Sequence, residues 1–196
     1  TAGTEEEGFG QGRAGNPIET IAGSASREFD YPSIFVEMVG RNTWGGMTLG
    51  LEYVPGDASI GAKSRTDSKG DQSESESDVG TYTGKAEISD FYQLYLEPTI
   101  YVSDSFGVYL KGGVNHITVT SLETLQSGGA YGNVDVWGGT IGAGLRYKHS
   151  SGFLVKTEFS RTKYEGVTLV SNTGNKNRIK ADPESDNLKL AIGYQF

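Results

Sequence analysis

The last ten residues of the chain, Asn187 to Phe196, alternate strictly between two kinds of side chain. One face is formed by Leu188, Leu190, Ile192, Tyr194 and Phe196, and the other by Lys189, Ala191, Gly193 and Gln195. A period of two residues is the signature of a β-strand with one apolar face, whereas a helix would repeat every three to four residues. The pattern therefore predicts a C-terminal amphipathic strand.

Six segments farther upstream repeat this alternation, with weaker contrast in the first. Their apolar faces consist of Ile34, Val36 and Met38; Met47, Leu49, Leu51 and Tyr53; Tyr92, Leu94, Leu96, Ile100 and Val102; Phe106, Val108, Leu110 and Val114; Trp137, Ile141, Ala143, Leu145 and Tyr147; and Phe153, Val155, Thr157 and Phe159. The sequence thus predicts an all-β fold with seven clear amphipathic strands.

The segments that join these strands alternate between short and long. The short ones lie near Arg41–Gly45, Ser103–Ser105 and His149–Gly152, and the long polar ones cover roughly Gly56–Ala86, Ser121–Asp135 and Glu165–Asp186. Tight turns at one end and long loops at the other are typical of an antiparallel up-and-down transmembrane β-barrel. A soluble meander has no reason to keep its long connections at one end.

Aromatic residues gather near both ends of the predicted strands. Near the short turns stand Trp44, Phe106, Tyr147, Phe153, Tyr194 and Phe196, and toward the long loops stand Tyr53, Tyr92 and Trp137. Aromatic side chains favour strands anywhere, which is the alternative explanation. Two separate belts, however, are what membrane interfaces require, and we expect these residues to lie there.

The polar faces of the strands carry ionisable residues of both signs, namely Glu37, Glu52, Glu97, Lys111, Arg146, Lys156, Glu158 and Lys189. On a soluble sandwich these side chains would face water. In a narrow membrane barrel they point inward, where an unpaired charge is costly, and four acids against four bases allow mutual pairing. We expect a lumen that is filled by a charge network and is therefore closed.

Composition narrows the function classes. At 196 residues the chain has the length of a single domain, and 25 acidic against 17 basic residues give a net charge of −8. This balance argues against nucleic acid as a partner. The absence of cysteine excludes disulfides and thiolate metal sites, and no apolar run is long enough for a transmembrane helix. The first residues do not form a signal peptide, so for an exported protein we expect the numbering to start after its cleavage site or later.

Candidate chemistry is sparse, and we expect no catalytic residue, metal site or cofactor. The two histidines, His116 at the long-loop end of a strand and His149 in a short turn, are too far apart in the topology to act together. The acidic stretch 65–78 has oxygen ligands but not the spacing of a calcium loop, so a solvated loop is expected. Glycine pairs at 112–113 and 138–139 lie inside strands, where they ease bending and close packing.

The terminal Tyr194, Gln195 and Phe196 resemble the C-terminal signature of outer-membrane barrel proteins, in which an aromatic residue ends an amphipathic strand. Together with the strand series, residues 31–196 resemble small eight-stranded bacterial barrels of the OmpA transmembrane-domain and OmpX type. The resemblance implies that Tyr194 and Phe196 form the signal read by the barrel-assembly machinery.

The strand count departs from this family, whose small members carry an even number of strands. Residues 1–30, at the long-loop end, form an N-terminal extracellular loop or an irregular first-strand segment, and only Pro17–Ala22 suggests extension. Three explanations remain open: the first strand lies upstream of this chain, residues near Gly15–Gly23 supply it, or a separate segment does. In each case the open edge needs a partner in lipid.

We therefore expect a non-enzymatic, integral outer-membrane β-barrel that serves envelope structure and surface interaction through long acidic loops. Its partners would be outer-membrane lipid, lipopolysaccharide and the assembly machinery, with neighbouring barrels or phage at the loops and no nucleic acid. One alternative is a narrow porin-like channel for ions or small solutes. The other is a soluble lipocalin-like binder, whose apolar face would turn inward around a ligand.

Overall fold

The computed structural model describes residues 2–9, 20–28, 30–67, 80–124, 132–170 and 178–196, most of which lie in antiparallel strands. The strands are β1 (Ala2–Phe9), β2 (Thr20–Arg27), β3 (Ile34–Arg41), β4 (Gly45–Val54), β5 (Ala58–Asp67), β6 (Gly80–Tyr101), β7 (Phe106–Thr124), β8 (Asn133–Lys148), β9 (Phe153–Tyr164), β10 (Val167–Val170), β11 (Arg178–Ala181) and β12 (Glu184–Tyr194). All twelve belong to one sheet, so the predicted all-β class is confirmed.

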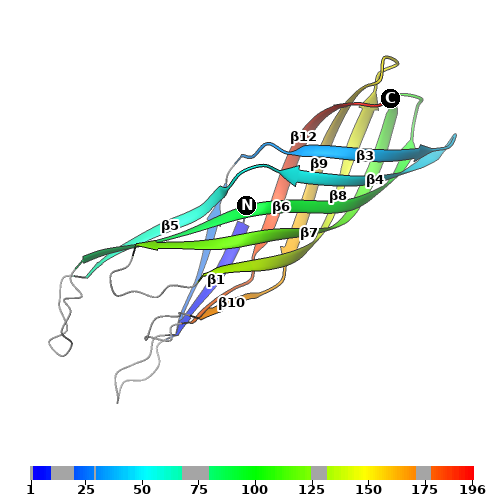
Figure 1. Ribbon diagram of the computed structural model, residues 1–196. Helices are drawn as coiled ribbons and strands as arrows, with labels where there is room; N and C mark the ends of the chain where they lie inside the picture. The colour runs from blue at the N-terminus through cyan, green and yellow to red at the C-terminus, as the bar shows by residue number, and fades with distance from the viewer. Residues whose placement is uncertain (1, 10–19, 29, 68–79, 125–131, 171–177) are drawn as a thin grey trace.

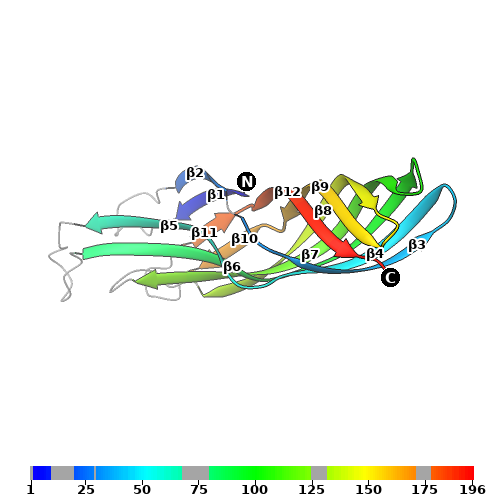
Figure 2. The ribbon, with the colours of Figure 1, turned by 90° about the horizontal axis from the view of Figure 1, so that it is seen from above.

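Seven strands form the curled wall of a barrel, in the order β3-β4-β6-β7-β8-β9-β12 (Figures 1 and 2). Every neighbouring pair is antiparallel, as in an up-and-down barrel. Among the described residues, β3 and β12 do not pair with each other. The wall therefore has the seven predicted strands and two free edges.

The two faces of this wall are divided as the alternation predicts. Leu190 and Ile192 are 69% and 63% exposed on the outer face, whereas Lys111 and Glu158 are only 4% and 3% exposed on the inner face. Such an arrangement is stable only if the surroundings of the barrel are apolar. The predicted inversion, with apolar side chains outside and ionised ones enclosed, is confirmed.

The short connections are closed by side chains of their first residues. The Asn42 carboxamide oxygen accepts the N–H of Gly45 at 2.8 Å, and the Ser103 hydroxyl accepts the N–H of Phe106 at 3.0 Å. In the third turn, His149 Nδ1 accepts the N–H of Ser151 at 3.2 Å. Asn and Ser favour turns for this reason, and His149 has a structural contact here.

The long connections differ from the expectation, because their described parts are strands. β5 pairs with the outer half of β6, and β7 and β8 continue their ladder to Thr120↔Asn133, so ribbons extend beyond the barrel wall (Figure 1). β6 changes its partner from β4 to β5 at a bulge near Asp90, whose φ is +53°. These ribbons are polar and lack the alternation that marks membrane strands, although backbone pairing does not require it. The tips at 68–79, 125–131 and 171–177 lie outside the described residues.

The N-terminal segment, for which an extracellular loop or an irregular first-strand segment was predicted, contains two strands in its described part. β1 and β2 form a regular hairpin from Ala2↔Arg27 to Phe9↔Thr20, and β1 also touches the outer end of β12 at Ala2↔Ser185. Residues 20–27 thus lie in a strand, but this strand pairs with β1 and not within the barrel wall. The predicted extension Pro17–Ala22 overlaps β2 at residues 20–22, and its first part, within residues 10–19, lies outside the described residues.

Candidate functional site

The interior of the barrel is the candidate site, because the inward residues of β4, β6, β7, β8 and β9 are largely buried and polar. Alternation places every second side chain of each strand there. From the short-turn end outward, this interior contains a basic mouth, a charged middle, an uncharged polar layer and an apolar cap.

The charged middle is organised in part around Lys156 on β9. Its ammonium donates to both carboxylate oxygens of Glu97, at 2.8 and 2.7 Å, and also to Glu37. The Tyr95 hydroxyl donates to Glu37 Oε1 at 2.8 Å. One lysine therefore pairs with two buried carboxylates, and the second of them, Glu37, also accepts a hydrogen bond from Tyr95.

Lys111 on β7 organises the other half of the charged middle. Its ammonium lies 3.1 Å from Glu158 Oε1 and 3.6 Å from Glu52 Oε2. Lys189 donates to the same Glu52 oxygen at 2.6 Å, and the Tyr109 hydroxyl lies 3.2 Å from Glu158 Oε2. We call the seven ionisable residues of both halves, Glu37, Glu52, Glu97, Lys111, Lys156, Glu158 and Lys189, the central network.

Two tyrosine rings join the halves of the central network. The Lys111 ammonium lies 4.1 Å from the centre of the Tyr95 ring, and the Lys156 ammonium lies 4.8 Å from that of Tyr109. Cations are attracted to aromatic faces, most strongly when they are desolvated. The tyrosines thus contribute both a hydroxyl donor to an acid and a ring face to a lysine.

Glycines on neighbouring strands make room for these rings. Gly50 lies opposite Tyr95 and Gly144 lies opposite Tyr109. A Cβ atom at Gly50 would lie 2.1 Å from Tyr95 Cζ, and one at Gly144 would lie 2.5 Å from Tyr109 Cζ. Each ring therefore lies flat over a strand that has no side chain at that point.

An uncharged layer follows toward the outer end. The Thr140 hydroxyl accepts from Gln93 Nε2 at 2.9 Å and from Asn115 Nδ2 at 3.0 Å, and lies 2.7 Å from the Thr162 hydroxyl. Beyond it, Ile117, Val136 and Val167 form a buried apolar cluster, with Phe91, Tyr164 and other apolar residues packed around it. This apolar cap closes the interior toward the ribbons.

Arg146 stands apart from the acids, at the short-turn end. It is 2% exposed, and its guanidinium donates to the Thr48 hydroxyl at 2.9 Å. Within the described part of the chain, no carboxylate lies within ion-pair distance of Arg146. The balance of four acids and four bases was expected to allow mutual pairing; Arg146 instead has a neutral partner, although it lies opposite Lys156 in the β8–β9 ladder.

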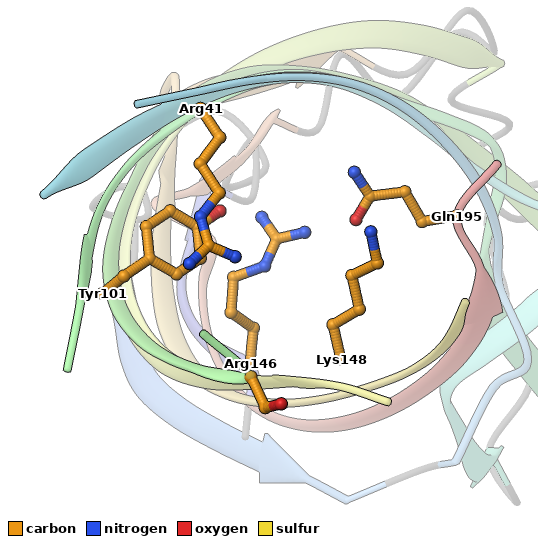
Figure 3. A pocket seen from close by; sticks show the side chains of 6 residues that line it. Arg41, Tyr101, Arg146, Lys148 and Gln195 are labelled. Atoms are coloured by element: carbon orange, nitrogen blue, oxygen red, sulfur yellow. The ribbon is translucent and has the colours of Figure 1, made fainter. Parts of the chain in front are cut away.

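A small pocket surrounds the Arg146 guanidinium at this end, lined by Arg41, Tyr101, Ser105, Arg146, Lys148 and Gln195 (Figure 3). We call it the basic mouth. The Arg41 guanidinium lies 3.8 Å from the centre of the Tyr101 ring and 3.8 Å from Asp104 on the exposed turn. Figure 3 shows the side chains of Arg41, Arg146 and Lys148 directed into the barrel.

The outer face carries the aromatic residues that were predicted at the interfaces. Trp44 is exposed in the first turn, Tyr147 and Phe153 are exposed beside the third, and Phe106 is half-buried beside the second. At the C-terminus the rings of Tyr194 and Phe196 meet edge to face at 5.2 Å. Toward the ribbons, Tyr53 stacks on Tyr92 at 4.9 Å, and Trp137 meets His116 at 5.0 Å. Their role at a membrane interface stays a prediction.

Charged pairs appear on the outer face directly beyond the apolar residues of β9 and β12. Arg161 forms two hydrogen bonds with Asp186, at 2.6 and 2.8 Å, and Lys163 lies 3.6 Å from Glu184. The hydrogen bonds from Arg161 lower the pKa of the Asp186 carboxyl. His116, with Asp135 at 3.7 Å, belongs to this same outer rim.

Several interior residues were not among the predicted site residues, notably Tyr95, Tyr109, Gln93, Thr140 and Thr162. All of them share the inward parity of the charged residues, so alternation alone would have identified them. Among the described residues, no group of three or more acidic or histidine side chains could hold a metal ion. In that same part of the chain, no helix is long and apolar enough to cross a membrane.

Comparison with known proteins agrees with this architecture. A family model described as the outer membrane protein β-barrel domain matches residues 9–196. Two crystal structures of Ail, the attachment invasion locus protein of Yersinia pestis, are similar to the chain. The complex with the heparin analogue sucrose octasulfate is 12% identical, with a TM-score of 0.44, and 100% of this chain and 94% of that chain are covered. The second structure is 11% identical, with a TM-score of 0.42 and the same coverage. No curated protein sequence matches the chain.

Proposed function

Because the chain belongs to the outer membrane protein β-barrel domain family, we propose that it is a non-enzymatic structural barrel that presents its long ribbons to partners at the cell surface. The protein is integral to the bacterial outer membrane. The apolar outer face contacts lipid there, and the free ends of the β5–β6 and β7–β8 ribbons project away from the wall.

The observation that carries this proposal is the filled interior. Ion pairs of the central network, the hydrogen-bonded layer around Thr140 and the apolar cap around Ile117 follow one another along the barrel. Together they favour a scaffold over a channel or a ligand-binding barrel. The polar surface that is left for partners lies on the ribbons and on the rim.

We assign the partners by the chemistry of each zone. The apolar face contacts outer-membrane lipid, and the rim next to Arg161 and Lys163 contacts lipopolysaccharide. Tyr194 and Phe196, at the exposed end of the last strand, serve as the signal for the barrel-assembly machinery. The long connections, of which the stretch 65–78 is acidic in a chain of net charge −8, contact neighbouring barrels or phage.

Surface labelling of intact cells tests this orientation. An epitope inserted between Asp67 and Gly80, at the end of the β5–β6 ribbon, should bind antibody without permeabilisation. The same epitope inserted between Ser150 and Ser151, in the turn between β8 and β9, serves as the matched control and should bind only after the outer membrane is opened. Labelling of the turn alone on intact cells would overturn the proposal.

Planar bilayer recordings separate the scaffold from a narrow porin-like channel. A barrel closed by the central network and the apolar cap should give no steady single-channel current, whereas a channel needs a continuous wet lumen. A steady conductance would favour the channel. The lipocalin-like alternative requires an apolar interior, and here the apolar residues Leu190 and Ile192 face outward.

A further inference from the structure

The buried cation of the basic mouth has a neutral partner where a counter-charge would be expected. Arg146 is 2% exposed, and its Nη1 donates to the Thr48 hydroxyl. Its neighbour across the β8–β9 ladder is Lys156, a second cation, whose ammonium is held by Glu97. A buried charge is costly when no opposite charge lies close to it. An anion that entered the mouth would remove this cost.

Two further cations share the pocket with Arg146. Arg41 ends β3, and Lys148 lies two residues after Arg146 on the same face of β8. Figure 3 shows Arg146 between Arg41 and Lys148. The other described lining residues are neutral and carry hydroxyl or amide groups, namely Tyr101, Ser105 and Gln195. Three positive charges thus converge in one pocket, and none of its described lining residues is acidic.

Packing holds Arg41 in place at the pocket. Its Nη1 donates to the backbone carbonyl of Asp104 at 2.7 Å, and its guanidinium lies 3.8 Å from the centre of the Tyr101 ring. That ring rests on two glycines, since a Cβ atom at Gly46 would lie 3.0 Å from Tyr101 Cε2 and one at Gly107 would lie 3.1 Å from its Cδ1. The Asp104 carboxylate is fully exposed, so water screens its ion pair with Arg41. A cation that is already held in position loses little conformational freedom when a ligand binds.

The set of donors fits a phosphate group better than a carboxylate. Guanidinium groups form paired hydrogen bonds with either anion. A carboxylate, however, has two oxygens in one plane and a single negative charge. A phosphate group has three acceptor oxygens and a charge of about −1.5 to −2 at pH 7. Each of the three converging cations can therefore contact a different oxygen of the same phosphate.

We propose that the basic mouth binds one phosphate group, with Arg146 at the inner end of the site and Arg41 and Lys148 at its entrance. The phosphate is either a soluble ion or the terminal group of a lipid headgroup. In the orientation of the proposed function the site faces the periplasm and the inner leaflet of the outer membrane, and only this placement rests on the proposed function. The binding itself requires the pocket and not its orientation.

Isothermal titration calorimetry with inorganic phosphate tests the site. The full chain is folded in an uncharged detergent at constant chloride concentration, and phosphate should bind saturably to a single site. Arg146→Met should weaken the affinity by about 10- to 100-fold, as expected for a charge-assisted contact. Lys148→Met should weaken it by a smaller factor, and it replaces Arg146→Met if that variant does not fold. Absence of saturable binding to the parent chain, or an unchanged affinity in either folded variant, would overturn the proposal.

Two comparisons establish where the anion binds and which chemistry it needs. Lys163→Met removes an exposed cation near the other end of β9 and should leave the affinity unchanged. A loss equal to that of Arg146→Met would place the anion on the outer rim, against the proposal. Acetate should bind at least about tenfold more weakly than phosphate, because it lacks the second charge and the third oxygen. Equal affinities would contradict the assignment of a phosphate site.

Native mass spectrometry distinguishes the two sources of the phosphate. The folded chain is released from micelles that contain phosphatidic acid, whose headgroup is a phosphate monoester. Retention of one lipid by the parent chain, lost on addition of inorganic phosphate and in Arg146→Met, would identify the headgroup as the ligand. Phosphate binding by calorimetry without retained lipid would identify a soluble phosphate. Both measurements are independent of the orientation of the barrel, so their outcome is separate from that of the surface labelling that tests the proposed function.

Discussion

The central network and the basic mouth both enclose basic side chains, but only the central network provides acids. Lys156 and Lys111 each contact two carboxylates, whereas Arg146 contacts the neutral Thr48 hydroxyl. Arg41 and Lys148 extend the mouth toward the open end of the barrel (Figure 3). The interior is therefore not uniformly charge-balanced, and its charges are separated along the barrel axis.

This difference shows which charges hold the barrel together. The central network has four carboxylates and three lysines, all enclosed between strands, so each group depends on its partner. A buried pair contributes little against an apolar replacement, but removing one partner leaves a costly isolated charge. In the basic mouth, within the described part of the chain, the buried Arg146 has no acidic partner, and the ion pair of Arg41 is with the fully exposed Asp104. Substitutions that remove a charge should thus have very different effects in the two regions.

The largest effect is expected for Lys156→Met. The substitution keeps an unbranched side chain but leaves Glu37 and Glu97 buried without their shared cation. The free energy of unfolding should fall by about 3 to 5 kcal/mol, measured by urea titration in lipid vesicles. The matched control is Lys163→Met, whose exposed pair with Glu184 should contribute only about 0 to 1 kcal/mol. Equal losses in the two variants would contradict a special role for the central network.

A smaller effect is expected for Gly50→Ala, which disturbs the central network through packing. The added methyl group would collide with the Tyr95 ring, which has to move away from Glu37. Overpacking of this kind typically costs about 1 to 3 kcal/mol. Gly112→Ala is the control, because a Cβ atom there meets nothing within 4 Å. The same unfolding titration should show a loss for Gly50→Ala alone, and a comparable loss for both would point to strand flexibility instead.

Sequence reasoning predicted the faces of the strands but not the contacts between them. The parity of Lys189 and Leu190 follows from alternation, which needs no knowledge of the neighbouring strand. Pairing of Lys156 with Glu97 depends on the stagger of strands across the barrel, which alternation leaves open. For the same reason the sequence could not tell that Arg146 lies apart from the acids.

The ribbons were mistaken for loops for a different physical reason. Backbone pairing does not require alternation of apolar and polar side chains, and β5 and the outer part of β6 have the composition of polar connections. The hairpin of β1 and β2 was missed in the same way. Periodicity therefore finds the strands that cross the membrane and does not find their extensions.

The smallest effect is expected for Arg146→Met, which applies to the basic mouth the same change that Lys156→Met makes in the central network. The variant loses the hydrogen bond to Thr48, at a cost of about 0.5 to 1.5 kcal/mol. It also removes a buried charge that has no acidic partner among the described residues, and this gain offsets the loss. The free energy of unfolding should stay within about 1 kcal/mol of the parent protein. Adding Thr48→Val removes the hydroxyl that has lost its hydrogen-bond donor, so the double variant should recover part of any loss in stability. The double-mutant cycle measures the interaction energy between Arg146 and Thr48. A loss as large as that of Lys156→Met would mean that Arg146 has an acidic partner after all, and the separation of charge along the barrel would then be wrong.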